Sequence, residues 1–418
     1  MSATTEQPRI FSYNFIAVSL INLFVMIAYY LLFVISSPYA AERFQASASL
    51  GGLVAGVMVL GCLAGRFVSG RLICNGYKKV LFTGMFVYLG SMVLYLTADS
   101  LALLLGIRFL NGIGIGGIGT VTGTLIAHIV PPGQRGLGLS YFSLSTIIAM
   151  AVGPFLGIFL MQRLTYPTLF MLCLGLGLVS LGIALFLRVP PLETSGEAPG
   201  EAKGEATAGD CRARAKRFSL SGLSGFIEIR VVPVSMVILL AAVCYGCVQA
   251  FISPFAAGRG LGEGASFFFL VYAAVVFVSR PFSGKLIDAR SENVVAYPAL
   301  LLTALSLGLL GMADSPFMLL LAGAMLGVGF GNFQSIAQVV SIKLVPRHRF
   351  AQATSTYFIF LDLGIGLGPY LLGLLVPRFG YGGLYLASSL IAFACIPLYY
   401  WLHGRKVARL AGQAAENK

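Results

Sequence analysis

The chain has 418 residues, of which 58% are hydrophobic and only 10% are charged. A soluble domain is usually about a quarter charged, so the apolar excess must face lipid. A formal net charge of +13 would indicate nucleic acid in a soluble protein, but in a membrane protein it follows from basic residues kept in cytoplasmic loops. We therefore expect the chain to lie in a lipid bilayer and not to bind nucleic acid.

The first apolar run follows a polar N-terminus and covers residues 11–36. It is too long for the core of a signal peptide and lacks a cleavage site, so it is predicted to be a membrane helix. A helix needs about 20 apolar residues to cross the hydrocarbon core. On that basis the predicted spans are twelve, at roughly 12–36, 48–69, 77–97, 101–129, 135–160, 166–188, 231–252, 265–287, 293–312, 317–343, 350–375 and 381–403.

Basic residues set the expected orientation. An even number of spans places both termini on one side, and cytoplasmic loops carry the excess of Lys and Arg. With the termini in the cytoplasm, 23 of the 28 basic residues fall on that side. The opposite side receives Arg43, Arg163, Arg259 and Arg378, and Arg108 falls within a span. We expect a multi-pass protein of the bacterial inner membrane with both termini cytoplasmic.

The apolar pattern is interrupted once, between residues 191 and 230. This segment is rich in Gly, Ala, Glu and Pro and then becomes basic, which is typical of a flexible linker, acting either as a tether or as a regulatory segment. It divides the chain into an N-terminal six-helix bundle (1–190), the linker, a C-terminal six-helix bundle (231–404) and a cytoplasmic tail (405–418).

The two bundles repeat each other with an offset near 215. The segment SPYAAER at 37–43 matches SPFAAGR at 253–259, and GRFVSGRLI at 65–73 matches SRPFSGKLI at 279–287. Short polar motifs in the same order cannot come from apolar composition alone. Because each half has an even number of spans, the halves share one orientation, which gives parallel repeats suited to alternating access around a midplane site. One chain supplies both bundles, so we expect a monomer.

The loop between the second and third spans resembles a motif of the major facilitator superfamily, G-x-L-A-D-R-x-G-R-R. Gly70 and the basic pair at 78–79 fit that pattern, whereas Cys74 replaces its acid. The second half keeps the acid as Asp288, followed by Arg290. In the family this loop is associated with holding the halves together at the cytoplasmic face.

Two further motifs extend the resemblance over nearly the whole chain except the linker. The run that begins at Arg108 is similar to the family's R-x-x-x-G-x-G segment, whose arginine is associated with proton coupling. The fifth span, with Gly153 and Pro154, resembles the pattern of the drug/proton antiporter branch, and Gly368 and Pro369 repeat it in the second half.

The resemblance implies an all-α membrane protein of the major facilitator fold, with twelve helices in two pseudosymmetric six-helix bundles. It also implies residues that control the switch between conformations. These gate candidates are Gly70, Asp288, Arg290, Gly153, Pro154, Gly368 and Pro369.

Charged residues inside the spans are few, and two of them are candidates for proton coupling. Asp362 lies near the middle of its span, where so short a side chain cannot reach water at the membrane surface. A buried carboxyl is costly to ionise, so it either exchanges a proton during transport or makes a structural contact with a neighbouring helix. Arg108 either takes part in coupling or extends to the lipid headgroups.

In the family the first, fourth, seventh and tenth spans line the central cavity. Their amide and phenol side chains either contact a solute and water or bond to another helix. The cavity candidates are Asn22, Tyr29, Tyr30, Asn111, Tyr245, Gln249, Asn332, Gln334 and Gln338. Such a lining suits a polar organic solute rather than a bare metal ion. Seven cysteines without metal-ligand spacing lead us to expect no metal site, and we expect no cofactor.

These features predict a secondary active transporter that uses protons to export a small polar organic molecule of the drug, sugar, nucleoside or metallophore class. The alternative is a proton-coupled symporter that imports a small metabolite, because fold alone does not set direction. The sequence contains no helical H-E-x-x-H motif and no nucleophile–base constellation, so we do not expect an enzyme.

Overall fold

The computed structural model describes residues 12–73, 76–130, 135–187, 227–289, 291–346 and 349–405, and these residues form a helical protein without strands. The N-terminal helices are α1 (Tyr13–Phe44), α2 (Ala48–Leu72), α3 (Tyr77–Tyr95), α4 (Leu101–Ile129), α5 (Arg135–Met161) and α6 (Tyr166–Leu185). The C-terminal ones are α8 (Val232–Gly258), α9 (Gly262–Ala289), α10 (Glu292–Gly311), α11 (Pro316–Leu326), α12 (Asn332–Lys343), α13 (Phe350–Gly373) and α14 (Val376–Tyr399).

Two short π-helices complete the set. One, η4 (Gly327–Gly331), joins α11 to α12 into one continuous rod, and η6 (Tyr400–Gly404) extends α14. Counting the joined rods once, the described chain has twelve long helical segments. Eleven are long and apolar enough to cross a membrane, and the remaining one, α3, has 19 residues with Lys78 and Lys79 in its first turn. The twelve predicted spans and the fold class are confirmed.

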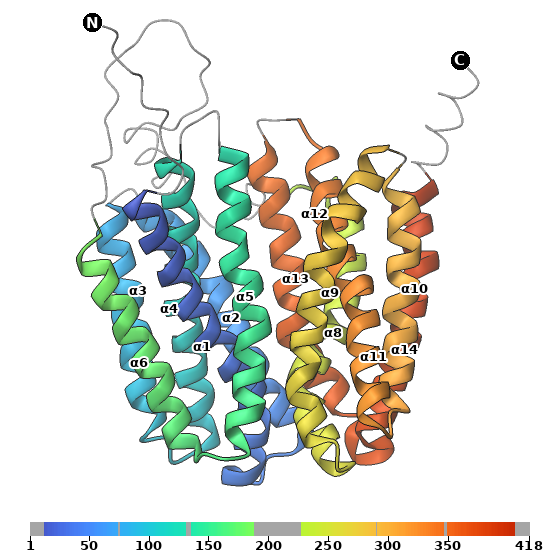
Figure 1. Cartoon of the computed structure of the whole chain (residues 1–418), viewed down its shortest axis with the longest axis horizontal. Helices are drawn as coiled ribbons and strands as arrows, with labels where there is room; N and C mark the ends of the chain where they lie inside the picture. Colours follow the sequence, from blue (N-terminus) through green and yellow to red (C-terminus); the bar gives the residue numbers. More distant parts are fainter. Residues whose placement is uncertain are drawn as a thin grey trace, which may run out of the picture.

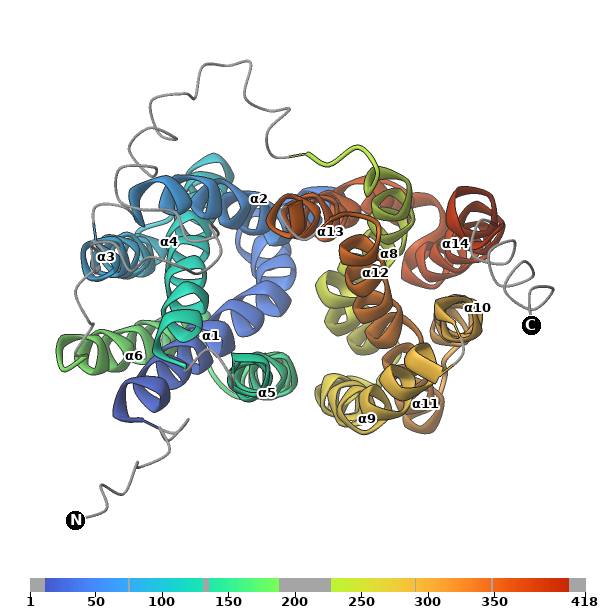
Figure 2. The ribbon, with the colours of Figure 1, turned by 90° about the horizontal axis from the view of Figure 1, so that it is seen from above.

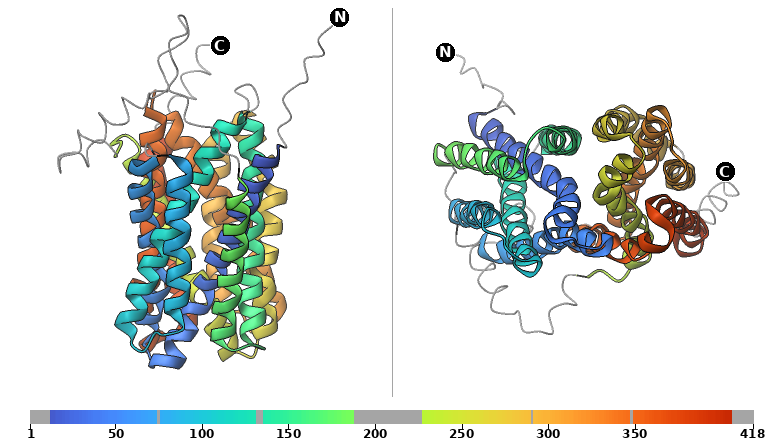
Figure 3. Two further views of the ribbon diagram at one scale, coloured as in Figure 1. Left: turned by 90° about the vertical axis from the view of Figure 1, so that its left-hand side faces the viewer. Right: turned by 90° about the horizontal axis from the view of Figure 1, so that it is seen from below.

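The helices form two bundles that stand side by side, α1–α6 in one and α8–α14 in the other (Figure 1). Helix α1 begins and η6 ends at the same end of the molecule (Figure 1), which we call the terminal end. The opposite end is called the far end. Seen along the helices, α2 and α13 lie side by side at the junction of the bundles (Figures 2 and 3).

Matched helix caps account for one repeated sequence motif. Ser100 and Ser315 close the two copies of Ala-Asp-Ser, and each accepts a hydrogen bond at 3.3 Å from the backbone N–H three residues on. A serine at this position satisfies one of the free N–H groups at a helix start. The repeated motif therefore fixes the far-end start of α4 and of α11.

Two predicted helix ends were too early. The first span was expected to end at 36 and the seventh at 252, but α1 continues to Phe44 and α8 to Gly258, through Pro38 and Pro254. A proline removes one backbone hydrogen bond and does not stop a helix that tertiary packing supports. Residues around both prolines are buried, so packing holds the helix beyond its apolar core.

The twelfth helix starts earlier than predicted but is interrupted near its start. Helix α14 includes Val376, five residues before the predicted start, but Gly380 inside it has a positive φ of 66° and a non-helical backbone. Only glycine adopts that conformation at low cost. The rod that crosses the bundle therefore begins after Gly380, in agreement with the predicted start at 381.

The two bundles are pressed together by glycines near the far end. A Cβ atom added to Gly56 of α2 would overlap the carbonyl of Gly366 on α13, and one added to Gly52 would overlap the carbonyl of Pro369. In addition, the Gln162 side chain donates to the Gly262 carbonyl at 3.0 Å. Glycine permits this backbone approach because it lacks a side chain. We call the contact between α2 and α13 the glycine seam.

The end of the predicted linker is bound to the C-terminal bundle. Glu228 accepts a 2.8 Å ion-pair hydrogen bond from Arg349, and its backbone N–H donates to the Thr356 hydroxyl at 2.9 Å. The hydrogen bond from Arg349 holds the pKa of the Glu228 carboxyl below its ordinary value. The linker therefore joins the bundle before α8 starts; residues 188–226 lie outside the described residues.

Candidate functional site

The centre of the molecule contains an ion pair that joins the two bundles. The Arg66 guanidinium of α2 donates to the Asp362 carboxylate of α13 at 2.5 Å. Asp362 lies midway along α13, and its side chain is 9% exposed, against 41% for Arg66. The guanidinium also lies 5.5 Å from the centroid of the Phe358 ring. Asp362 therefore has a partner in the other bundle, and that partner is not Arg108.

Three tyrosines interact with this pair, and a fourth lies beside them. Tyr29 and Tyr30 of α1 are half-buried and interact electrostatically with both Arg66 and Asp362. Their rings meet edge to face with centroids 4.9 Å apart. Helix α1 packs against α8 of the other bundle as well as against its own neighbours, and its two tyrosines interact with residues of that bundle, Asp362 and, for Tyr30, Arg280. Tyr357 of α13 interacts with Asp362 as well, and Tyr245 of α8 interacts with Tyr29 and Tyr30.

An aromatic stack supports the second bundle beside this site. The Tyr245 ring stacks on Phe330 with centroids 4.3 Å apart and on Tyr272 with centroids 5.6 Å apart. Phe330 lies in η4, where the chain makes a local π-turn. Such turns insert an extra residue into a helix and frequently occur at functional sites. Here the turn supplies the ring on which Tyr245 packs.

Arg108 is inside the N-terminal bundle and is fully buried. It donates to the Val54 carbonyl at 2.8 Å and to the Ala55 carbonyl at 3.0 Å, both on α2, and to the Tyr95 hydroxyl at 3.3 Å. It does not extend to the lipid headgroups, as one alternative expected. Its contacts fasten α4 to the part of α2 that carries the glycine seam.

We expect Arg108→Ala to lower the thermal stability of the purified protein in detergent by several degrees. The substitution removes charge-assisted hydrogen bonds worth about 1.5–3 kcal/mol each and leaves a buried cavity. Arg108→Lys should restore part of the loss, because an ammonium can still reach one of the carbonyls. A midpoint unchanged in both variants would contradict a structural role.

Three of the predicted cavity amides bond within their own bundle instead. Asn22 donates to Ser145 at 2.8 Å and to Thr146 at 3.1 Å, between α1 and α5. Asn111 donates to Ser91 of α3 at 2.9 Å. Asn332 donates to Ser279 and accepts from Ser283 of α9, both at 2.9 Å. These amides stabilise helix packing, which was the alternative open to each of them.

The remaining cavity candidates lie closer to the centre. Gln249 is buried and donates to the Tyr245 hydroxyl at 3.3 Å. Gln334 and Gln338 are half-buried and one turn apart on α12, and the backbone carbonyl of Gln334 accepts from the Tyr357 hydroxyl at 2.9 Å. Tyr357 in turn interacts with Asp362, so the backbone of Gln334 is linked to the ion pair through this tyrosine.

The glycine–proline gate candidates occupy matching positions. A Cβ on Gly153 of α5 would lie 2.8 Å from the Ile27 carbonyl of α1, and one on Gly368 of α13 would overlap the Val243 carbonyl of α8. Each glycine therefore packs its helix against the first helix of its own bundle. Gly70 has open space around it. The Asp288 side chain and Arg290 lie outside the described residues.

The sequence analysis missed Arg66 and its repeat partner Arg280. Both were counted with the cytoplasmic basic residues because they lie near span ends, and both belong to the matched segments at 65–73 and 279–287. In the structure Arg280 interacts electrostatically with Tyr30 of the other bundle and with Tyr272. The repeat alignment was the available signal, since it places two arginines at equivalent positions on corresponding helices of the two halves.

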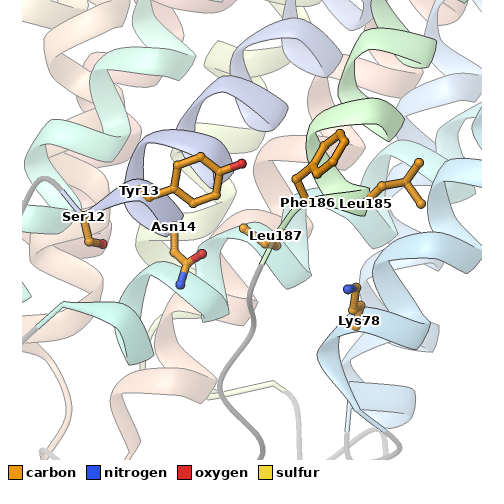
Figure 4. Close-up of a pocket in the computed structure, with 7 residues that line it drawn as sticks. All are labelled: Ser12, Tyr13, Asn14, Lys78, Leu185, Phe186 and Leu187. Atoms are coloured by element: carbon orange, nitrogen blue, oxygen red, sulfur yellow. The ribbon is translucent and has the colours of Figure 1, made fainter.

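Two surface hollows lie away from this centre. The hollow at the terminal end, of about 840 Å³, is bounded by the starts of α1 and α3 and the end of α6 (Figure 4). A second, of about 540 Å³, is bounded by Arg259, Gly311, Met312 and Asp314 at the far end. Neither includes a residue of the ion pair or its tyrosines.

Related proteins with this architecture are transporters. An uncharacterized MFS-type transporter of Burkholderia mallei (strain SAVP1) is 25% identical over 380 residues, which cover 88% of this chain and 86% of that protein. The uncharacterized MFS-type transporter YhhS of Escherichia coli (strain K12) is 26% identical over 368 residues, which cover 86% of this chain and 85% of that protein.

Solved structures match the fold at low sequence identity. A bacterial homolog of the human lysosomal transporter Spinster, in an inward-facing and unoccupied conformation, has a TM-score of 0.74 at 16% identity over 95% of this chain and 98% of its own. A mutant of the nucleoside transporter NupG has a TM-score of 0.72 at 13% identity, over 92% of this chain and 100% of its own. A POT family transporter in complex with 5-aminolevulinic acid has a TM-score of 0.75 at 12% identity, over 96% of this chain and 98% of its own.

The Major Facilitator Superfamily profile matches residues 18–318 and 295–418, which together exceed half of the chain. With twelve helices in two bundles and a polar centre between them, the chain therefore belongs to the Major Facilitator Superfamily and is a secondary transporter.

Proposed function

We propose that this chain is a proton-coupled exporter of a small polar organic molecule, working by alternating access as a monomer in the bacterial inner membrane. The observation that carries the proposal is the Arg66–Asp362 ion pair, which joins the two bundles at the middle of α13. Two bundles that rock around a central site need a contact whose strength depends on the transported ion.

Protonation of Asp362 changes that contact directly. The charged carboxylate attracts Arg66, whereas the neutral carboxyl can only share a hydrogen bond with it. Removing one charge from a buried pair costs about 3–5 kcal/mol, and the 41% exposure of Arg66 reduces this by solvent screening. Even a bias of about 1.4 kcal/mol changes a two-state ratio tenfold, so binding and release of one proton can drive the rocking motion.

The arrangement of the bundles fits one stage of such a cycle. The glycine seam and the Gln162–Gly262 hydrogen bond close the far end. The two side-chain hydrogen bonds between the bundles for which both partners are described, Arg66–Asp362 and Gln162–Gly262, lie at the centre and at the far end. If the terminal end is cytoplasmic, as the distribution of basic residues predicts, the structure corresponds to an inward-open carrier that has released its proton.

Export is favoured over import by the fifth helix. Its Gly153–Pro154 pattern resembles the drug/proton antiporter branch, and Gly153 packs closely against α1. The second candidate, a proton-coupled symporter that imports a metabolite, uses the same ion pair and differs in which form of the carrier binds the solute. The tyrosines and amides at the centre favour a polar organic solute in both cases.

Transport assays in oriented vesicles test the direction and the coupling. Inverted membrane vesicles acidified inside should accumulate the solute, and collapse of the pH gradient with a protonophore should stop accumulation. Right-side-out vesicles with the same imposed gradient supply the matched control. Accumulation driven by protons moving in the same direction as the solute would establish the symporter instead, and a reporter fused at Lys418 that is active only in the periplasm would overturn the orientation.

A further inference from the structure

Arg280 is a cation inside a membrane-spanning helix and forms no ion pair among the described residues. It lies in α9, nine residues before Ala289. Its Nε atom is buried and has no hydrogen-bond partner, and none of the ion pairs of the described residues includes it. An unpaired arginine within a span is costly, so its retention at this depth calls for a partner that is present only part of the time.

The repeat explains why Arg280 is unpaired. Arg66 occupies the equivalent place in the first half and pairs with Asp362 of α13. With the offset of 215 that matches Gly153 to Gly368, the counterpart of Asp362 on α5 is Ile147. Of the two arginine–acid pairs that the repeat would allow, only Arg66–Asp362 is therefore present. For Arg280, the repeat supplies an apolar residue at the position equivalent to Asp362.

No acid in the other half can replace the missing partner. Residues 7–190 contain only two acids, Glu42 and Asp99, and both lie at the far end, in the last turn of α1 and just before α4. Rocking of the bundles cannot carry them to the depth of Arg280. The centre thus holds two arginines and one aspartate, which leaves one positive charge for a mobile anion.

The surroundings of Arg280 suit an organic anion. Its guanidinium interacts electrostatically with the hydroxyls of Tyr30, which is half-buried between the bundles, and of Tyr357. A guanidinium can bind a carboxylate or a phosphate group through two parallel hydrogen bonds. A tyrosine beside it can contact the apolar part of the same molecule and donate from its hydroxyl.

We propose that Arg280 binds the anionic group of the transported solute, so that the substrate class is a small organic carboxylate, phosphate or phosphonate. This inference rests on the proposed function, because it places the solute in the space between the bundles. Asp362, paired with Arg66 of the N-terminal bundle, then exchanges the proton, and the unmatched Arg280 binds the solute.

The test measures binding without a pH gradient. The purified full chain in detergent is titrated with benzoate and with phenyl phosphate, and neutral benzamide serves as the uncharged probe; the midpoint of thermal unfolding reports binding. We expect saturable stabilisation by at least one of the two anions below about 10 mM, and none by benzamide. Arg280→Gln should weaken anion binding by at least about tenfold, because a charge-assisted bidentate contact is lost.

Two further variants control for folding and for charge. Arg280→Lys keeps the charge and should weaken binding less than Arg280→Gln, and Arg163→Gln removes an exposed far-end arginine and should leave binding unchanged. The inference is overturned if neither anion binds, if benzamide binds as well as the anions, or if Arg280→Gln keeps wild-type affinity. A vesicle assay that finds no proton coupling would refute the proposed function and leave this binding result in place.

Discussion

Asp362→Asn is expected to lower solute accumulation driven by a pH gradient by at least about tenfold. Exchange of solute for solute should continue. The amide has nearly the shape of the carboxyl but cannot exchange a proton or attract Arg66 by charge. The contact between the bundles then no longer depends on protonation. A ligand or ion shifts a conformational equilibrium only through different affinities for the two states, so the proton loses its influence on the cycle.

The measurement compares driven accumulation with counterflow in vesicles that contain equal amounts of protein. Asp362→Glu keeps an ionisable group within reach of Arg66 and should retain part of the driven transport. Thermal unfolding in detergent separates loss of coupling from loss of fold, since Arg66 is left with an uncompensated charge in the Asn variant. Wild-type accumulation by Asp362→Asn would show that the carboxylate is only a structural contact.

Gly56→Val is expected to prevent closure of the far end and to stop transport. In the structure a Cβ at Gly56 overlaps the Gly366 carbonyl, and in the reverse direction a Cβ on Gly366 would lie 3.1 Å from the Gly56 carbonyl. Backbone atoms on both sides leave no flexible group to move aside. Overpacking of this kind costs about 1–3 kcal/mol, which the molecule can relieve by separating the bundles at the seam.

Labelling of a cysteine next to the seam measures that separation. Ser49 lies in the first turn of α2 and packs against Gly373 of α13, so a membrane-impermeant maleimide should react with Ser49→Cys faster when Gly56→Val is also present. Gly106→Val is the matched control, because Gly106 has open space around it and the substitution carries the same helix cost. Equal labelling rates with and without Gly56→Val would contradict a role of the seam in closure.

The sequence was sufficient to predict the membrane helices and the internal repeat. Membrane helices are set by runs of apolar residues that satisfy their own backbone groups, so the twelve spans follow from local composition. It was insufficient for the ends of α1 and α8, where helices continue through Pro38 and Pro254. Whether a helix continues past a proline depends on the packing of the flanking residues, which local composition does not contain.

The candidate site likewise contains residues that the sequence could identify and residues that only the tertiary structure could identify. Asp362 could be selected from sequence because an acid in the middle of a span is rare, but its partner could not, since Arg66 is 296 residues away along the chain. The polar amides were open to two interpretations. In the structure Asn22, Asn111 and Asn332 bond to serines and a threonine within their own bundle, a contact that depends on packing between helices and that local composition does not contain.

By itself, the sequence determined the number of helices, the two matched halves and the acid at the centre, because hydropathy and the repeat are properties of the chain read in order. Only the tertiary structure decided that Arg66 completes an ion pair across the bundles and that Arg280 does not. Pairing depends on which faces of α2, α9, α5 and α13 meet, and those faces are brought together by contacts between residues distant in the chain, such as Gly56 and Gly366 in the glycine seam.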